Sequence, residues 1–421
     1  MFKICIFFFI FLNSINFCFS QEISNKFISR KYWTSNPSIE AIKKDIQLGN
    51  DPTELNEYNF DPVTWAILES VSNQTIIFLI NLNGNGINKK SHDGRPPIFW
   101  AAYKDNIELM EYLIKENAKL DIIDDHGYSL VNFAATTGQL NKKIYELCKS
   151  NGVKFSEQLN NDGASPLLLL IPHMPNSEMI DYFTINNLDI TQTDKYGNNA
   201  FVYASKTGNI NIMNYLVEKG LNIRANNDAA VIYASKGTRK KKNSIETYKY
   251  LKNLGLSINV KDSKGKTALH YVANYSSDTS LYRYLIDNNL STNARDSIGM
   301  TPFLYSVQNN SIEGIKILIE EKTNVNKKNS KGENALHIAV KRKNKEIINN
   351  IIKEIKNINE KTNEGMTALH ISAMNSKNNE ILKTLLKHGA DKKLKTNFNE
   401  TAFMLAKENE LLNNTPLNFL K

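Results

Sequence analysis

The sequence predicts an all-α repeat protein, a solenoid in which one unit of two helices and a turn recurs along most of the chain. Nearly the same phrase occurs three times, as GKTALHYVA (265–273), GENALHIAV (332–340) and GMTALHISA (365–373). Counterparts of its first glycine run from Asn59 to Asn399, ten steps over 340 residues, or 34 residues a step. At 421 residues the chain is too long for one small core, and this regular period favours an elongated array over separate globular domains.

Each unit begins with a tight turn. The recurring position, called the turn position below, holds only Gly or Asn, the residues that most readily adopt left-handed backbone conformations. Three residues earlier stands Asp, Asn, Ser or Thr in every unit but one, where Arg224 takes its place. This pattern predicts a type I turn. The turn positions are Asn59, Gly94, Gly127, Gly163, Gly197, Asn227, Gly265, Gly299, Gly332, Gly365 and Asn399.

Two helices follow the turn in each unit. A helix N-cap residue stands two places after most turn positions, and proline follows it in four units, at the first helical position. A small alanine comes seven or eight places after the turn position and lets a second helix approach closely. That second helix shows apolar residues at helical spacing, as in IELMEYLIK and INIMNYLVEK. It often ends at a C-cap residue, namely Gly84, Asn117, Gly220, Gly255, Asn289 or Gly389.

This order of turn, helix, tight turn, helix and finger resembles the ankyrin repeat. The family pattern D-x-x-G-x-T-A/P-L-H-x-A is matched most closely by DSKGKTALHYVA (262–273) and DSIGMTPFLYS (296–306), and the resemblance runs from about Ser38 to about Pro416. It implies a right-handed stack of helix pairs with β-hairpin fingers along one edge, whose concave side usually binds proteins. We expect an N-terminal capping partial repeat at 21–58, about ten repeats at 59–398 and a C-terminal capping repeat at 399–421.

The first twenty residues predict a secretory signal peptide, 1–20. Lys3 gives a positive start, Ile4 to Leu12 form an apolar run, and Ser20 suits cleavage before Gln21. An uncleaved anchor is the alternative, although the run is short for a membrane span. Cleavage predicts an exported chain, periplasmic or secreted, that does not insert into the membrane. It would hold a single cysteine, Cys148, and therefore no internal disulfide.

One unit departs from the pattern. The finger between Gly220 and Asn227 is about three residues shorter than the others, and Ala229 stands where an N-cap residue is expected. The same unit gains five residues between its helices, at 237–243. We expect this unit to be the least stable. Drift in one repeat explains the change, since loops tolerate insertion, and a kink or a docked partner is the alternative. A second disturbance is Pro172 and Pro175, which should end a first helix early.

Three histidines, five residues after their turn positions, invite a catalytic or metal-binding interpretation. Equivalent positions in a stack lie roughly 8–10 Å apart, too far to share a metal ion at ~2 Å. No nucleophile or orienting acid recurs beside them, so we expect no catalytic, cofactor or metal site and no enzyme activity. In the ankyrin family this histidine bonds to the turn backbone and ties neighbouring fingers together. The residues given this structural role are His270, His337, His370, Gly265, Gly299, Gly332 and Gly365.

Two surfaces are candidates for binding a protein. An aromatic row, six residues after the turn positions, predicts packing between repeats or a ladder open to the groove; it comprises Trp65, Trp100, Phe133, Tyr203, Tyr233, Tyr271 and Tyr305. Finger tips vary freely, and apolar tips have no folding reason to be there. The predicted partner-contact residues are Tyr128, Tyr196, Ile298, Phe398, Trp100, Arg95 and His126.

The formal net charge of +9 makes the chain mildly basic, and two basic clusters lie on the loop edge opposite the fingers. They are Arg239, Lys240, Lys241 and Lys242, and Lys341, Arg342 and Lys343. A solvated surface is one interpretation, and binding to an anionic envelope polymer is the other. We predict a monomeric, non-enzymatic scaffold that grips a protein, with no nucleic-acid partner. A secreted effector or toxin-neutralising factor is the alternative role.

Overall fold

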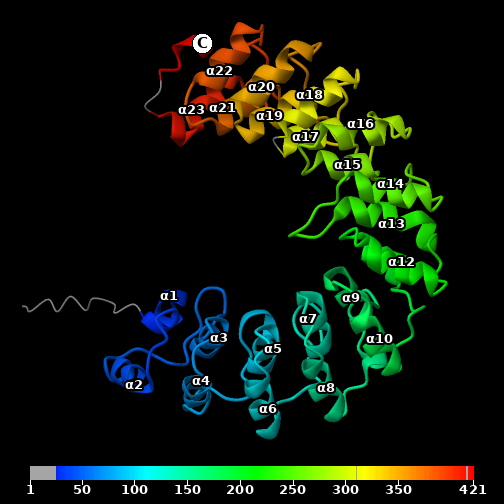
Figure 1. Ribbon diagram of the computed structural model, residues 1–421. Helices are drawn as coiled ribbons and strands as arrows, with labels where there is room; N and C mark the ends of the chain where they lie inside the picture. The colour runs from blue at the N-terminus through cyan, green and yellow to red at the C-terminus, as the bar shows by residue number, and fades with distance from the viewer. Residues whose placement is uncertain (1–24, 310, 414–415) are drawn as a thin grey trace, which may run out of the picture. The chain divides into compact units, whose positions relative to one another are not determined.

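The computed structural model describes residues 25–309, 311–413 and 416–421; the predicted signal peptide lies outside them. The chain divides into two compact units, Met1–Val153 and Lys154–Lys421. Both are built from short helices joined by turns, coloured blue to cyan in the first unit and green to red in the second (Figure 1).

Helix pairs alternate regularly along the first unit. A short η1 (Lys26–Ile28) and α1 (Arg30–Trp33) precede α2, which occupies the place expected for a capping helix, Ser38 to Leu48. First helices of the pairs are α3 (Pro62–Leu68), α5 (Pro97–Tyr103) and α7 (Leu130–Thr137). Second helices are α2 (Ile39–Gln47), α4 (Asn73–Ile80), α6 (Ile107–Lys115) and α8 (Lys142–Ser150), and η2 (His92–Gly94) lies in a finger.

The second unit continues the alternation. First helices are α9 (Pro166–Leu170), α11 (Ala200–Ser205), α13 (Ala225–Lys236), α15 (Ala268–Ala273), α17 (Pro302–Gln308), α19 (Ala335–Arg342), α21 (Ala368–Asn375) and α23 (Ala402–Glu408). Second helices are α10 (Glu178–Ile185), α12 (Ile210–Glu218), α14 (Ile245–Asn253), α16 (Thr279–Asp287), α18 (Ile312–Glu320), α20 (Lys345–Ile351) and α22 (Glu380–Lys387). Short 3₁₀ turns are η3 (Phe155–Glu157), η4 (Ile171–His173), η5 (Ile352–Glu354), η6 (Glu410–Leu412) and η7 (Asn418–Leu420).

The helices begin and end at the residues that the sequence indicates. Asp61 accepts a hydrogen bond from the backbone N–H of Thr64 at 2.7 Å, and Thr301, Asn334 and Thr367 cap their helices in the same way. The expected cap Ser165 makes no such bond. All eleven turn positions and all six expected C-cap residues have positive φ, which Gly and Asn adopt at the least steric cost.

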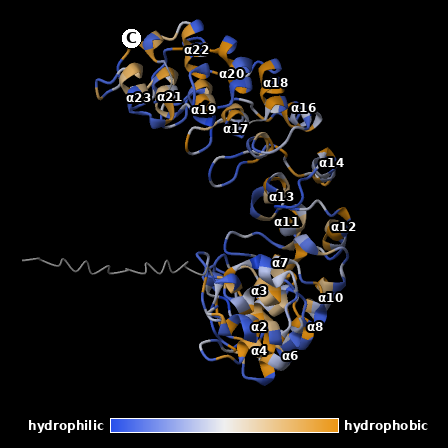
Figure 2. Ribbon diagram, turned by 90° about the vertical axis from the view of Figure 1, so that its left-hand side faces the viewer, coloured by the Kyte–Doolittle hydropathy of each residue, from blue (hydrophilic) through white to orange (hydrophobic). Residues whose placement is uncertain are grey.

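A continuous apolar layer fills each unit. Successive first helices contact one another, as α3, α5 and α7 do in the first unit and α11, α13 and α15 do in the second. The small residues predicted to permit this approach are fully buried: Ala66, Ala101, Ala134, Ala204, Ala234, Ala273, Ala339 and Ala373. Figure 2 shows apolar residues on the helices and hydrophilic residues along the connecting loops. Burying each large side chain stabilises the stack by about 1.5–3 kcal/mol.

The fingers close as turns rather than as regular β-hairpins. In one finger the backbone N–H of Asp262 donates to the carbonyl of Lys266, and that of Gly265 donates to the carbonyl of Asp262, both at 2.9 Å. Within the described ranges no strand forms, only isolated antiparallel bridges at Ile123–Ser129 and Lys395–Thr401. Of the predicted β-hairpin pairing, the described residues show only these two bridges.

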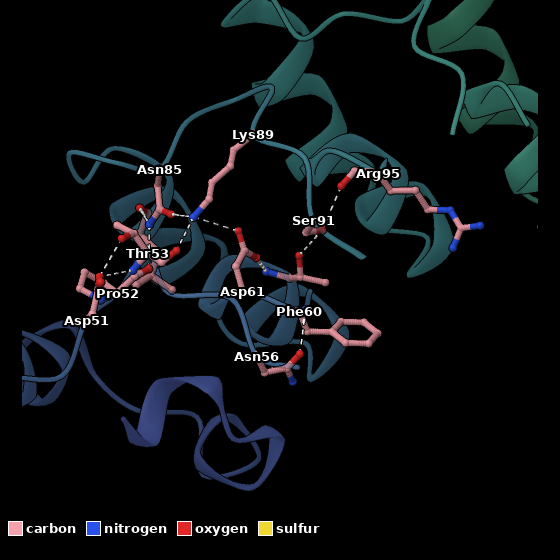
Figure 3. A network of polar contacts seen from close by, with 12 residues as sticks. Asp51, Pro52, Thr53, Asn56, Phe60, Asp61, Asn85, Lys89, Ser91 and Arg95 are labelled. Carbon is pink, nitrogen blue, oxygen red and sulfur yellow. Dashed lines mark hydrogen bonds and ion pairs between the residues drawn. The ribbon is translucent and has the colours of Figure 1, made fainter. Parts of the chain in front are cut away.

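A lysine holds the base of the fingers in the first unit. Lys89 donates from Nζ to the carbonyl of Thr53 at 2.7 Å and to Oδ1 of Asn85 at 2.8 Å, and lies 3.5 Å from the Asp61 carboxylate (Figure 3). Asn85 in turn donates to the carbonyl of Pro52 at 3.0 Å. These bonds tie the connecting segments of consecutive repeats together through buried or half-buried polar groups, which need such partners.

Both predicted disturbances occur. The helix α9 ends at Leu170 and gives way to η4 around Pro172, because proline interrupts the helical hydrogen bonding. In the short finger, Asn226, Asn227 and Asp228 have φ of 49°, 53° and 59°, so one left-handed turn replaces the ordinary finger. The buried Asp228 carboxylate accepts from the backbone N–H of Ser257 at 2.8 Å and from Nη1 of Arg224 at 3.1 Å.

Candidate functional site

The finger tips of the second unit are joined into a ribbon by backbone hydrogen bonds. In each bond the N–H of one tip donates to a carbonyl of the preceding tip, at 2.8–3.2 Å. The donor and acceptor pairs are Lys195 to Asp162, Ser297 to Lys264, Ser330 to Ile298, Asn363 to Lys331 and Asn397 to Glu364. A ribbon of this kind holds the tip side chains in fixed positions.

Glycine at the turn positions permits the close approach of the next finger. A Cβ added at Gly332 would lie 2.8 Å from the backbone nitrogen of Asn363, and one at Gly365 would lie 2.7 Å from that of Asn397. Both distances are shorter than real Cβ contacts. These glycines therefore serve the ribbon as well as the left-handed turn, a second reason that the sequence did not reveal.

The ribbon is interrupted at the short finger. Among the described residues, no backbone hydrogen bond joins 222–228 to the tip at Tyr196 or to the tip at Ser263. Side chains replace it on one side only, where Asn226 donates from Nδ2 to Oδ1 of Asn198 at 2.9 Å. The shortened segment therefore leaves a break between two stretches of ribbon.

The three histidines have the structural role that the sequence predicts. Nδ1 of His337 accepts from the backbone N–H of Asn334 at 3.2 Å, and Nε2 lies 3.0 Å from the carbonyl of Glu360 in the next unit. Because Nδ1 accepts a backbone proton, Nε2 carries the hydrogen and donates it. His270 bonds to Thr267 and Ala294, and His370 bonds to Thr367 and Leu394, in the same arrangement.

Burial keeps these histidines neutral. It lowers the pKa of His270 to about 4 and lowers the pKa of His337 and His370 as well, since a buried imidazolium loses its hydration. Each ring already uses both nitrogens in hydrogen bonds to the protein. A neutral ring with two bonded nitrogens holds neighbouring fingers and has no free atom for chemistry.

The predicted contact residues separate into exposed tips and buried side chains. Tyr196, Ile298 and Phe398 are 57%, 55% and 76% exposed. His126 is also exposed and lies 3.3 Å from the Asp93 carboxylate. Tyr128 stands next to its turn position and is half-buried, so it offers less surface than a true tip.

Two of the predicted contact residues are buried. Trp100 is 5% exposed and donates from Nε1 to Oγ of Ser91 at 3.0 Å. Arg95 is 8% exposed; its guanidinium donates to the Asp124 carboxylate at 2.7 Å and lies 4.2 Å from the centre of the Phe133 ring. Both side chains are buried in the first unit, so neither belongs to the candidate binding surface.

Most of the aromatic row is packed, as the first interpretation holds. Trp100, Phe133, Tyr203 and Tyr305 are buried, whereas Trp65, Tyr233 and Tyr271 are half-buried. In three units the tyrosine hydroxyl donates to the Asp that opens its own turn: Tyr203 to Asp194 at 3.0 Å, Tyr271 to Asp262 at 2.5 Å and Tyr305 to Asp296 at 2.8 Å. The nine-residue spacing of Tyr and Asp was the available signal for this pairing.

Two lysines that the sequence analysis overlooked lie on this row. Nζ of Lys206 is 4.4 Å from the ring centre of Tyr203 and 5.1 Å from that of Tyr233. Nζ of Lys236 is 5.0 Å from the ring centre of Tyr233 and 5.6 Å from that of Tyr271. Burial lowers the pKa of Lys206 to about 8 and also lowers the pKa of Lys236, because the half-buried ammonium groups are partly stripped of water.

A pocket of about 530 Å³ opens at the break in the ribbon. Its walls include the exposed tip Tyr196, the amides Asn198 and Asn226, and the half-buried Tyr233 and Lys236. A smaller pocket of about 380 Å³ borders the other side of the same short segment, at Leu221 and Asn222. Of the predicted contact residues, Tyr196 alone is among those lining the larger pocket.

The two basic clusters differ in how their charge is engaged. Arg239, Lys240, Lys241 and Lys242 are exposed on the added loop, where Lys242 donates to the carbonyl of Lys236 at 2.8 Å. In the second cluster Lys341 forms an ion pair with Glu333, while Arg342 and Lys343 are exposed. The described part of the chain has no group of three or more His, Cys, Asp or Glu residues suited to a metal ion. It has no helix long and apolar enough to span a bilayer.

Comparison with known proteins gives two findings. A family model described as ankyrin repeats, in three copies, matches residues 63–158, 167–262, 232–329 and 321–396. The ankyrin repeat protein nuc-2 of Neurospora crassa is 25% identical over 196 residues, which cover 46% of this chain and 18% of that protein. The matched part of this chain therefore spans less than a fifth of the length of that relative.

Proposed function

This chain belongs to the ankyrin-repeat family, and we propose that it is an exported, non-enzymatic scaffold that binds a protein partner through its finger tips and first helices. The observation that carries the proposal is the ribbon of bonded fingers, which presents exposed apolar tips such as Tyr196, Ile298 and Phe398. Exposed apolar side chains on a rigid surface are typical of protein contacts, and rigidity lowers the ordering cost of binding.

Export rests on the N-terminal pattern of Lys3, the apolar run from Ile4 and Ser20. Export would place the partner in the envelope or in the medium. A monomeric scaffold there acts on a resident protein, or serves as a secreted effector or toxin-neutralising factor. Binding of an anionic polymer through the basic edge is the second candidate, favoured by the exposed cluster Arg239–Lys242.

Site-specific photo-crosslinking tests the proposal. A benzophenone amino acid replaces Tyr196, Ile298 or Phe398 in the full chain, and the proteins are exposed to envelope and medium fractions of the source cells. The control carries the same group at Ile185, on the second helix α10, which is 81% exposed. The same protein crosslinked from the tips and not from Ile185, at low and high salt, supports the scaffold.

A different result would redirect the assignment. Equal crosslinking from Ile185 and from the tips would contradict a dedicated binding face. Retention of a polymer that is lost on adding salt, and lost when Arg239 and Lys240 are replaced, would favour the basic edge, because contacts with exposed charges are screened by salt.

A further inference from the structure

The short finger lacks about three residues relative to the other fingers, and it also lacks a hydrogen-bond acceptor for the tyrosine of its repeat. In three other units the turn opens with Asp, which accepts a hydrogen bond from the tyrosine hydroxyl of the same unit, but here Arg224 stands in that place. The Tyr233 oxygen instead accepts from Nδ2 of Asn198 at 2.8 Å. Accepting this bond leaves the O–H of Tyr233 available as a donor at the pocket.

Two ammonium groups beside Tyr233 also lack an ion-pair partner. Within the described residues, Nζ of Lys206 and Nζ of Lys236 make contacts with aromatic rings and no hydrogen bond or ion pair. Half-buried ammonium groups that are not hydrogen-bonded are costly, because ring contacts replace only part of their hydration. Lys236 lines the pocket directly, whereas Lys206 lies beside it, with Nζ 5.1 Å from the ring centre of Tyr233.

The acids nearest to these lysines are already engaged. Asp262 accepts from the hydroxyl of Tyr271 at 2.5 Å and from the backbone N–H groups of Lys264 and Lys266 at 2.9 Å. Asp194 accepts from the hydroxyl of Tyr203 at 3.0 Å and from Nδ2 of Asn198 at 2.8 Å. The exposed Lys261 adds a further cation to the pocket wall. Asp262 itself lines the pocket, but its oxygens are engaged, whereas Lys236, Lys261 and the hydroxyl of Tyr233 remain as donors there.

We propose that this pocket receives a carboxylate side chain from an acidic segment of the protein partner, held by Lys236 and the hydroxyl of Tyr233, with the positive charge of Lys206 nearby. The proposal rests on the scaffold function above and names the chemistry of its partner. The carboxylate of the partner replaces the acceptor that is missing from this repeat, where Arg224 stands at the position of the turn-opening Asp. Charge-assisted hydrogen bonds in a half-buried site are stronger than those on an open surface.

A peptide suits this pocket better than a nucleic acid. The rings of Tyr203, Tyr233 and Tyr271 already carry ammonium groups, so they are not free to stack on bases. A volume of about 530 Å³ accommodates a few side chains, whereas nucleic-acid binding needs an extended basic track. Asn226, through Oδ1, and the exposed amide of Asn227 line the same pocket and can pair with a peptide backbone.

The test measures binding of the full chain to a fluorescein-labelled peptide of alternating Glu and Gly, by fluorescence anisotropy at about 0.15 M salt. A peptide with Gln in place of Glu is the ligand control. We compare Lys236→Met and Lys206→Met, which keep the apolar stem, and Tyr233→Phe, which removes only the hydroxyl. Lys240→Met is the matched control, since it removes the same charge from the exposed loop.

We expect the Glu peptide to bind and the Gln peptide to bind at least tenfold more weakly. Lys236→Met should weaken binding about tenfold or more, Lys206→Met and Tyr233→Phe several-fold, and Lys240→Met less than twofold. In the unsubstituted protein, NMR of Lys236 should show its ammonium titrating at higher pH when the Glu peptide is bound. This last measurement does not depend on the stability of any variant.

Four outcomes would overturn the proposal. These are no binding of the Glu peptide, equal binding of the Gln peptide, an equal loss in Lys240→Met, and displacement by a single-stranded RNA at lower concentration than the peptide requires. The scaffold function fails separately. If the finger tips still crosslink a partner in Lys236→Met, the scaffold stands and this pocket is not its site.

Discussion

Two regions of the repeat array differ in structure: the regular fingers from Asp262 to Asn399, and the short segment from Gly220 to Gly237. In the first region every tip after the first donates a backbone hydrogen bond to the tip before it, and buried histidines fasten three of the four first helices to the following turn. In the second region Asn226, Asn227 and Asp228 form a left-handed turn, the ribbon breaks, and a pocket opens.

This difference shows how a repeat array acquires a specific site. Hydrogen bonds repeated from one repeat to the next make the regular fingers rigid. The same bonds occupy polar groups that could otherwise bind a ligand. Removing about three residues frees donors around Tyr233 and Lys236 at the cost of three strained residues. The following predictions test this contrast, starting with the largest expected effect.

Acid should destabilise the histidine-fastened region most. The pKa of His270 is about 4 in the folded chain and 6.5 in an ordinary histidine, so the unfolded chain binds a proton first as pH falls. This stability is present above pH 6.5 and is lost between pH 6.5 and pH 4, by about 3 kcal/mol for His270. Urea unfolding at several pH values measures the loss.

His270→Leu is the control for the acid effect. It should be less stable at neutral pH, because the N–H of Thr267 and the carbonyl of Ala294 lose their partner. It should also lose less stability on acidification than the unsubstituted chain. An unchanged pH dependence would contradict the assignment to this histidine.

Gly332→Ala should lower the free energy of unfolding by about 2 kcal/mol. Alanine is strained at this positive φ, and its Cβ would in addition clash with Asn363. Gly389→Ala is the matched comparison: its φ is +91° and no atom lies within 4 Å of the added Cβ. It should therefore cost about 1 kcal/mol, the conformational part alone. Equal losses in thermal unfolding would show that the ribbon does not require glycine.

Asp228→Asn should cost about 1 kcal/mol in the short segment, since it keeps the shape and weakens the bonds to Ser257 and Arg224. The comparison is Arg224→Ala, whose side chain is 57% exposed and whose ion pair is largely screened. A larger loss in Arg224→Ala, measured by chemical unfolding, would show that the arginine rather than the buried carboxylate holds the segment.

Replacing Arg239 and Lys240 by serine should change stability by less than about 0.5 kcal/mol, because both side chains are exposed on the added loop. Thermal unfolding followed by circular dichroism measures the change. A clear loss would mean that the loop is part of the fold rather than an addition to it.

The regular part of the fold was predictable because each element has a local cause. Gly and Asn mark the turns, Thr367 and Asp61 cap helices, and alanines mark close helix contacts. The ankyrin family follows from the same residues. The resemblance to the ankyrin family also implied the role of His337, and the recurring position argued against a shared metal site.

The site was less predictable because it depends on contacts between units. Nothing near Arg95 or Trp100 in the sequence shows that both side chains turn inward against Asp124 and Ser91. The short finger was visible as a deletion, but the pocket it opens and the lysines on the rings of Tyr233 appear only when neighbouring repeats are stacked.

Hydrogen–deuterium exchange of the full chain, with and without the Glu peptide, tests the contrast most directly. Amides of the ribbon, including Ser297, Ser330 and Asn363, should exchange slowly in both states. Amides of residues 222–236 should exchange faster in the free chain and gain protection when the peptide is bound. Equal protection of both regions in the free chain, or a peptide effect confined to the regular fingers, would contradict the account.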